Sequence, residues 1–167
     1  MPIIADFRPS PNFDARPEGA TVDVIVIHNI SLPPGEFGGP HIEELFQNRL
    51  HPGAHPYFAG IAALKVSAHF LIRRDGEVIQ FVDTDQRAWH AGVSNWQGRE
   101  RVNDFSIGIE LEGTDDRAFE DAQYDALKSL LGKLFARYGV LPLTGHSQIA
   151  PGRKTDPGPS FDWSRLD

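Results

Sequence analysis

Three side chains close together near the end of the chain could carry out chemistry. His146, Lys154 and Asp156 lie in a stretch interrupted by several prolines and glycines. Proline and glycine disfavour both helix and strand, so we expect a loop that presents these side chains. An imidazole and a carboxylate are zinc ligands, but a catalytic zinc takes three protein ligands and keeps one position open for water. A third ligand must therefore come from elsewhere in the sequence.

His28 is the best candidate for this third ligand. It closes a largely apolar run, and the run predicts a buried strand over residues 22–28. The end of a buried strand holds a side chain rigidly, as a metal ligand requires. A histidine at a strand end is, taken alone, more often a structural residue than a ligand. The inference depends on His28, His146 and Asp156 occurring together.

Glu110 is the candidate for a group that moves protons. It lies in residues 105–113, where apolar residues alternate with small or polar ones as in a strand. An inward, unpaired carboxylate is expensive unless a metal-linked network or an ion pair holds it. We favour the metal-linked network for Glu110 and expect the nearby Glu112 to be an ordinary exposed carboxylate.

This set of residues suits the hydrolysis of an amide, which is a poor electrophile with a poor leaving group. Zinc lowers the pKa of a bound water to about 7. Glu110 could accept the proton of that water and pass it to the departing nitrogen. Lys154 could stabilise the oxyanion together with the metal. The other interpretation makes Lys154 and Asp156 no more than a solvated surface pair.

The remaining candidate histidines have weaker signals. His51 and His55 have the spacing of a helical zinc pair, but each precedes a proline and the glutamate of the helical zinc motif is absent. We expect His69 to be a hydrogen-bonded residue of the core. His90 and Trp89 could line a substrate cleft, where the indole ring suits the apolar face of a sugar, or they could belong to an aromatic cluster.

Composition limits the class of protein. A length of 167 residues with 40% hydrophobic residues is enough for one sizeable core, so we expect one domain over residues 1–167. The net charge of −7 argues against nucleic acid and anionic membranes as partners. The absence of cysteine excludes disulfides and a thiol nucleophile. The first residues do not resemble a secretion signal and no segment approaches the ~20 apolar residues of a membrane span, so we expect a cytoplasmic protein.

The elements that must position these residues can be predicted in order. After the strand at 22–28 come a loop at 31–40 rich in glycine and proline and a short helix at 41–49. Residues 68–82 predict a hairpin whose Asp-Gly pair suits a type I′ turn. A strand at 105–113 and a helix with leucines at helical spacing up to Gly139 follow. This order predicts an α/β (α+β) fold with a central mixed β-sheet flanked by helices.

Several motifs together carry a family resemblance. They are Ile27-His28-Asn29, Ser67-Ala68-His69-Phe70-Leu71-Ile72, Arg87-Ala88-Trp89-His90-Ala91-Gly92, Ser106-Ile107-Gly108-Ile109-Glu110-Leu111-Glu112-Gly113, Thr144-Gly145-His146 and Arg153-Lys154-Thr155-Asp156-Pro157-Gly158-Pro159. The chain resembles the zinc-dependent N-acetylmuramoyl-L-alanine amidases, in particular their cytoplasmic 1,6-anhydro-muropeptide (AmpD) type, from about residue 22 to 163. The resemblance implies an amidase or peptidoglycan-recognition-like fold.

The resemblance also implies roles for residues. His28, His146 and Asp156 would bind one zinc per chain, and Glu110 and Lys154 would act in catalysis. The substrate would be a small soluble anhydro-muropeptide released in cell-wall recycling, bound by a monomer. Removal of this muropeptide would link the protein to β-lactamase regulation.

Four residues are candidates for contacting the substrate: Asn29, Lys65, Trp89 and Arg101. Lys65 and Arg101 could pair with carboxylates of the stem peptide. Lys65 stands where the family favours arginine, and a lysine keeps the charge but loses the bidentate fork.

Two other functions compete with the recycling amidase. One is a peptidoglycan-recognition module without catalysis, against which the complete ligand set argues. The other is a lytic amidase that attacks intact peptidoglycan, against which the acidic charge and the lack of a secretion signal argue.

Overall fold

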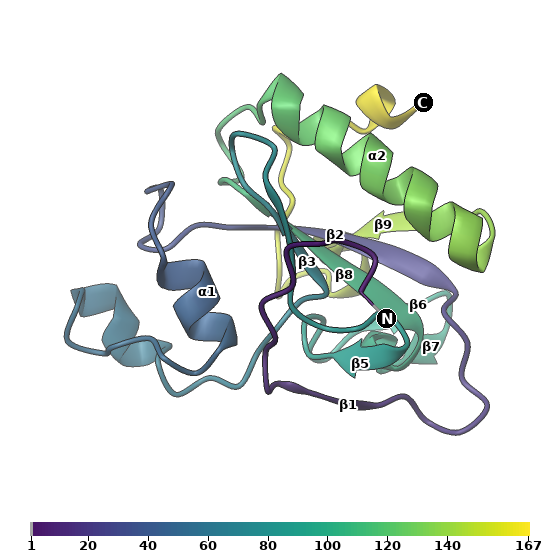
Figure 1. The fold of residues 1–167 in the computed structure, drawn as a ribbon, viewed down its shortest axis with the longest axis horizontal. Helices are drawn as coiled ribbons and strands as arrows, with labels where there is room; N and C mark the ends of the chain where they lie inside the picture. The colour runs from purple at the N-terminus through teal and green to yellow at the C-terminus, as the bar shows by residue number, and fades with distance from the viewer. Residues whose placement is uncertain (1) are drawn as a thin grey trace.

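A five-stranded mixed sheet lies at the centre of the computed structural model, which describes residues 2–167 (Figure 1). Its strand order is β4-β3-β8-β2-β9, with β3, β8, β2 and β9 parallel and β4 antiparallel at one edge. The strands are β1 (Phe13–Ala15), β2 (Val24–Ile30), β3 (Phe70–Ile72), β4 (Val78–Gln80), β5 (Gln86–Ala88), β6 (Asn95–Trp96), β7 (Arg99–Glu100), β8 (Ser106–Glu112) and β9 (Leu143–Gly145). The helices are α1 (His41–Phe46), α2 (Asp121–Tyr138) and α3 (His146–Ile149), with 3-10 turns at Pro56–Gly60, Val102–Phe105 and Trp163–Leu166. The predicted mixed sheet with flanking helices is confirmed.

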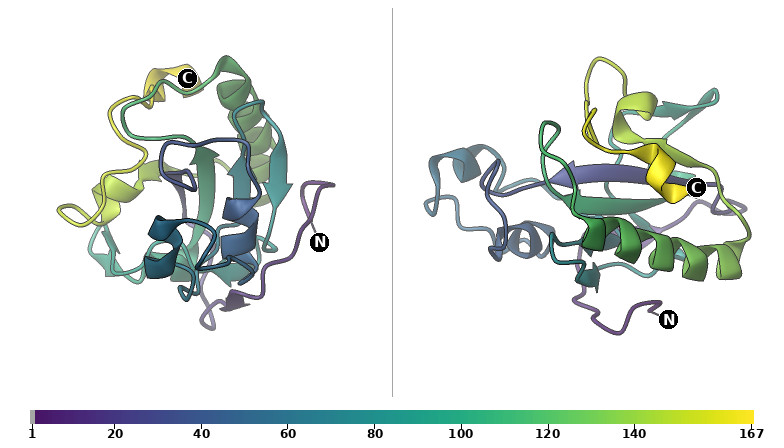
Figure 2. Two further views of the ribbon diagram at one scale, coloured as in Figure 1. Left: turned by 90° about the vertical axis from the view of Figure 1, so that its left-hand side faces the viewer. Right: turned by 90° about the horizontal axis from the view of Figure 1, so that it is seen from above.

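The two central strands separate two faces of the sheet. Because successive side chains of a strand point to opposite faces, Ile25 and Ile27 of β2 face α2, while Val26 and His28 face away from it. Val24 and Val26 share a cluster with Ile149 of α3, so α3 covers the face opposite α2. Figure 2 shows α2 and α3 on opposite sides of β2.

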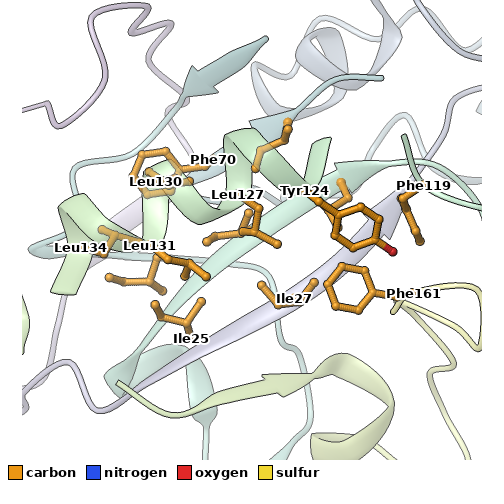
Figure 3. Close-up of a cluster of buried hydrophobic side chains, with 14 of the residues drawn as sticks. Ile25, Ile27, Phe70, Phe119, Tyr124, Leu127, Leu130, Leu131, Leu134 and Phe161 are labelled. Atoms are coloured by element: carbon orange, nitrogen blue, oxygen red, sulfur yellow. The ribbon is translucent and has the colours of Figure 1, made fainter. Parts of the chain in front are cut away.

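The long helix α2 closes the larger core. Its leucines recur at three- and four-residue spacing and pack onto isoleucines of β2 and β8 (Figure 3). The buried leucines are Leu127, Leu130, Leu131 and Leu134. The helix ends at Tyr138, and Gly139 follows with a φ of 83°. The prediction of a helix up to a glycine cap is confirmed.

The predicted hairpin is confirmed, but its turn type is not. A type I′ turn needs a positive φ at both central residues. In the β3–β4 turn only Gly76 has one, at 89°, and its amide donates to the Arg73 carbonyl over 2.9 Å. Asp75 keeps a negative φ, so the turn is a longer one that ends in a left-handed glycine.

Other boundaries also differ from those expected. The first predicted strand is shifted toward its carboxyl end and runs over Val24–Ile30, and the helix predicted at 41–49 ends at Phe46. Two small antiparallel pairs, β1 with β5 and β6 with β7, were not predicted. Within residues 2–167, no helix is long and apolar enough to cross a membrane.

Candidate metal and catalytic site

The candidate site lies at the carboxyl end of the parallel strands, where ligands of such sheets commonly bind. His28 of β2 and Glu110 of β8 are direct neighbours in the parallel register, on the face opposite α2. His146 is the first residue of α3, directly after β9, which also pairs with β2. Asp156 follows in the loop after α3. Two strands, a helix and a loop therefore bring the predicted residues to one point.

The three predicted metal ligands meet at short distances. The Nδ1 atom of His28 lies 3.0 Å from Nδ1 of His146 and 3.1 Å from Oδ2 of Asp156, and His146 Nδ1 lies 3.3 Å from the same carboxylate oxygen. The three ligand atoms would lie about 3.3 Å from one another around a tetrahedral zinc with bonds of 2.0–2.2 Å. The His28, His146 and Asp156 group could therefore hold a metal ion, and its donor set fits zinc.

The other nitrogen of each histidine also has a partner. His146 Nε2 lies 2.9 Å from the carbonyl oxygen of Ala91, and His28 Nε2 lies 2.9 Å from Nδ1 of His90. His90 Nε2 in turn lies 3.0 Å from the hydroxyl of Ser106. A histidine ligand is usually held by such a contact, which fixes its tautomer and leaves the opposite nitrogen free for the metal. The sequence predicted His90 only as a cleft or cluster residue and missed this role.

The absence of a side chain at Gly108 leaves space for the His90 ring against the sheet. A Cβ atom at Gly108 of β8 would lie 2.5 Å from the His90 ring. The alternation of small residues in this strand was visible in the sequence, but the sequence did not indicate which side chain fills the space.

Glu110 lies beside the ligand group and is only 9% exposed. Its Oε1 atom is 3.9 Å from Nδ1 of His28, and its Oε2 atom has no hydrogen-bond partner within the described residues. Burial raises the pKa of Glu110 well above its ordinary value, nearby Asp156 raises it further, and Lys154 opposes the shift. A buried carboxylate with one oxygen left without a hydrogen bond, next to three candidate metal ligands, is suited to exchange a proton with a bound molecule.

The pKa of Asp156 is shifted in the opposite direction to that of Glu110. Burial by itself would raise its pKa, but the contacts with His146 and His28 outweigh burial, and the pKa lies below its ordinary value. The carboxylate therefore stays ionised, as a metal ligand must.

A cleft of about 630 Å³ opens over these residues, a size typical of small-molecule sites. Lys154 and Arg153 bring positive charge to it, and both are exposed. Apolar residues line another part of the cleft: Leu32, Leu45, Phe46, Tyr57, Ile61, Leu64 and Val66. Arg153 was not predicted; its guanidinium donates to the carbonyls of Ala91 and Val93.

Two of the four predicted substrate contacts line this cleft. Trp89 lines it while its indole N–H donates to Asp14 over 3.1 Å. Asn29 lines it as well. Lys65 is exposed between two lining residues but is not itself among them, and Arg101 is also not among them. The Arg101 side chain is 77% exposed and lies 3.5 Å from Asp104.

Three other histidines behave as expected from the sequence. His51 and His55 lie outside α-helices, and each ring accepts a hydrogen bond from a nearby backbone N–H. His69 is fully buried, where it contacts the carbonyl of Gln86 and the amide of Gly108.

The expectation for Glu112 is wrong. Its side chain is 2% exposed, and it accepts from the amides of Gly38 and Arg74 and from the Arg73 guanidinium. The alternating pattern of the strand did not reveal these distant donors.

Comparison with known proteins agrees with this geometry. The family model described as N-acetylmuramoyl-L-alanine amidase matches residues 18–159. The chain belongs to this amidase family. The expected family and the peptidoglycan-recognition-like fold are confirmed.

Known amidases are similar to this chain over most of its length. The chain is 64% identical over 160 residues to the 1,6-anhydro-N-acetylmuramyl-L-alanine amidase AmpD of Citrobacter freundii, and the match covers 95% of this chain and 86% of the relative. The crystal structure of a selenomethionine AmpD derivative superposes with a TM-score of 0.95 at 61% identity, over 98% of this chain and 93% of the other.

More distant structures share the fold of the amidase. The Escherichia coli amidase AmiD, solved with the substrate anhydro-N-acetylmuramic acid-L-Ala-D-gamma-Glu-L-Lys, has a TM-score of 0.65 at 32% identity, over 89% of this chain and 58% of AmiD. Drosophila peptidoglycan recognition protein SA has a TM-score of 0.61 at 24% identity, over 92% and 82%.

Proposed function

We propose that this amidase hydrolyses the amide between the lactyl group of 1,6-anhydro-N-acetylmuramic acid and L-alanine, in soluble muropeptides of cell-wall recycling. The observation that carries the proposal is the group formed by His28, His146 and Asp156 beside Glu110, whose buried Oε2 atom has no hydrogen-bond partner within the described residues. The name of the Citrobacter relative and the substrate bound to AmiD support the choice of sugar.

The metal we propose is one zinc per chain, held by His28, His146 and Asp156. Two imidazoles and one carboxylate are typical of catalytic zinc sites, which keep a position open for water. When bound, zinc supplies a water of lowered pKa and polarises the scissile carbonyl. Ala91 and His90 support the proposal because they hold the two ligand histidines by their other nitrogens.

Glu110 is the proposed general base and acid. Its carboxylate takes a proton from the attacking water and gives it to the nitrogen of the departing L-alanine, which would otherwise leave as an unstable anion. The burial that raises the pKa of Glu110 makes it a better proton acceptor than an ordinary glutamate.

Lys154 is the proposed electrostatic partner of the scissile carbonyl. It lines the cleft beside Asp156, and the ammonium can approach an oxygen that becomes negative as the carbonyl is attacked. Trp89 is the proposed platform for the sugar ring. Asn29, Lys65 and Arg101 remain predictions as substrate contacts, and the cytoplasmic location and monomeric state also remain predictions.

A comparison of substrates tests the proposal. We expect the zinc-loaded protein to release the peptide from an anhydro-muramyl tripeptide with a kcat/KM at least ~10-fold above that for the reducing muramyl tripeptide, equivalent to about 1.4 kcal/mol. We expect little lysis of intact sacculi. Strong lysis of sacculi would favour a lytic amidase, and tight binding of muropeptide without cleavage would favour a recognition module.

A further inference from the structure

Asp115 connects two segments that carry metal ligands. It lies in the loop after β8, where its Oδ1 atom accepts the side-chain amide of Asn29 over 2.7 Å. Its Oδ2 atom accepts the hydroxyl of Thr155. Asn29 directly follows the ligand His28, and Thr155 directly precedes the ligand Asp156. One carboxylate therefore contacts the chain neighbours of two ligands.

A second contact holds the other side of Asp156. The same side-chain nitrogen of Asn29 donates to the carbonyl of Pro157 over 3.0 Å. The ligand Asp156 thus lies between two residues, Thr155 and Pro157, that are both tied to the strand end carrying His28.

The backbones of the two loops are also in close contact. A Cβ atom at Gly158 would lie 2.5 Å from Cα of Asp115, and the amide of Ser160 donates to the Asp115 carbonyl over 3.3 Å. Only glycine fits at position 158, whose φ is 82°. The approach of the loops is therefore built into the backbone as well as the side chains.

We propose that Asp115 and Asn29 are positioning residues that set Asp156 at the correct distance from His28 for the metal. Asp115, Asn29, Thr155 and the Pro157 carbonyl together form what we call the loop clamp. Asp115 itself is no ligand, because both of its oxygens accept hydrogen bonds within the clamp. Asn29 acts through the clamp, which assigns it a different role from the substrate contact predicted from the sequence. The inference rests on the metal site of the proposed function.

The test is the zinc affinity of clamp variants, measured without substrate by competition with a chelator. We expect Asp115→Ala to raise the zinc Kd by about 10- to 100-fold, the usual effect of losing a group that orients metal ligands. Thr155→Val removes the hydroxyl at an exposed position and should raise the Kd in the same direction. The double variant should lose less than the product of the two single losses, because both remove the same contact.

Two controls separate the clamp from simple charge. Asp116→Ala removes a neighbouring carboxylate that also lines the cleft but makes no hydrogen bond within the described residues, so its Kd should change only a few-fold. Asp115→Asn removes the charge but keeps the contacts, since an amide can accept from Asn29 and donate to the Thr155 hydroxyl. We expect this variant to retain most of the zinc affinity. The cobalt-substituted Asp115→Ala protein should also show an altered visible spectrum, which a loss of stability alone would not produce.

The outcomes are distinct. Parent-like zinc affinity in Asp115→Ala, or equal losses in Asp115→Ala and Asp116→Ala, would overturn the clamp. If Asp115→Ala does not fold, the zinc affinity of Thr155→Val decides, and an unchanged Kd there overturns the proposal. Failure of the parent protein to bind zinc would instead reject the metal site of the proposed function, before any variant is considered.

Discussion

Glu110 and Lys154 have opposite surroundings although both face the same cleft. Glu110 is buried and has an oxygen without a hydrogen-bond partner, whereas the Lys154 side chain is exposed and makes no hydrogen bond within the described residues. Burial makes a carboxylate hold a proton more tightly, and exposure keeps an ammonium charged. These surroundings suit a proton carrier and an electrostatic partner.

The first prediction separates the roles of Glu110 and the ligands. We expect Glu110→Gln to keep the zinc content of the parent while kcat falls by ~10²-fold or more, the usual loss for a general acid–base group. Asp156→Asn should lose zinc in addition to activity, because an amide replaces an ionised ligand. Metal analysis and steady-state kinetics measure both effects. Equal loss of zinc in the two variants would make Glu110 a ligand.

The second prediction concerns His90. Without its contact to Nε2 of His28, the His28 ring is free to turn and to change its tautomer. We therefore expect His90→Ala to raise the zinc Kd by about 10- to 100-fold in a chelator competition. His51→Ala is the matched control, because this exposed histidine lies away from the cleft lining, and it should bind zinc like the parent. Parent-like affinity in His90→Ala would show that the contact does not support the metal.

Among the elements, the loop at 31–40 depends on β8. Glu112 at the end of β8 accepts the amide of Gly38 over 2.8 Å and also holds Arg73. Arg73 reaches Glu43 of α1 as well. Because residues from this loop line the cleft, Glu112 holds one wall of the site in place.

The third prediction tests this wall. Glu112→Gln places amide hydrogens against donors, so we expect a loss of about 1–3 kcal/mol in the free energy of unfolding. KM should rise about fivefold or more, equivalent to ~1 kcal/mol of binding, with a smaller change in kcat. Glu77→Gln is the control, since Glu77 also contacts Arg73 but is 43% exposed. An unchanged KM in Glu112→Gln would show that the loop position does not affect binding.

The sequence predicted the elements whose pattern is local. The apolar run of β2, the alternation of β8 and the leucine spacing of α2 each contain their own signal. The antiparallel pair of β1 and β5 has no such local signal. It joins Phe13 to Ala88, and β2, β3 and β4 lie between these residues in the sequence.

The same distinction applies to the site. His28, His146 and Asp156 could be found by residue type and by the family resemblance, and the structure brings them together. The contacts of His90 and Asp115 could not be predicted, because each depends on which distant side chain the residue meets. That Arg101 does not line the cleft likewise became visible only in the folded chain.

For the whole molecule, buried neutral histidines predict sensitivity to acid. The pKa of His69 is lowered from 6.5 to about 3, chiefly by burial and also by neighbouring Arg16, while the contact with Gln86 opposes the shift. Burial also lowers the pKa of His28 and of His90. Below pH 6.5 the unfolded chain binds protons that the folded protein does not, so unfolding becomes easier as the pH falls.

The fourth prediction follows from this loss of stability at low pH. We expect the free energy of unfolding of the metal-free protein to decrease as the pH falls from 6.5 toward 3, with His69 contributing up to ~1.4 kcal/mol per pH unit. Denaturant unfolding at several pH values measures the slope. His69→Gln should reduce the slope whatever its effect on stability at neutral pH. An unchanged slope in this variant would show that His69 is not the group that titrates.

The dependence of amide cleavage on zinc tests the proposed amidase function most directly. The protein should contain about one zinc per chain and release L-alanyl peptide from anhydro-muramyl tripeptide. Removal of the metal with a chelator should abolish cleavage, and added zinc should restore it in proportion to the zinc bound. Cleavage at the original rate by the metal-free protein would contradict the account.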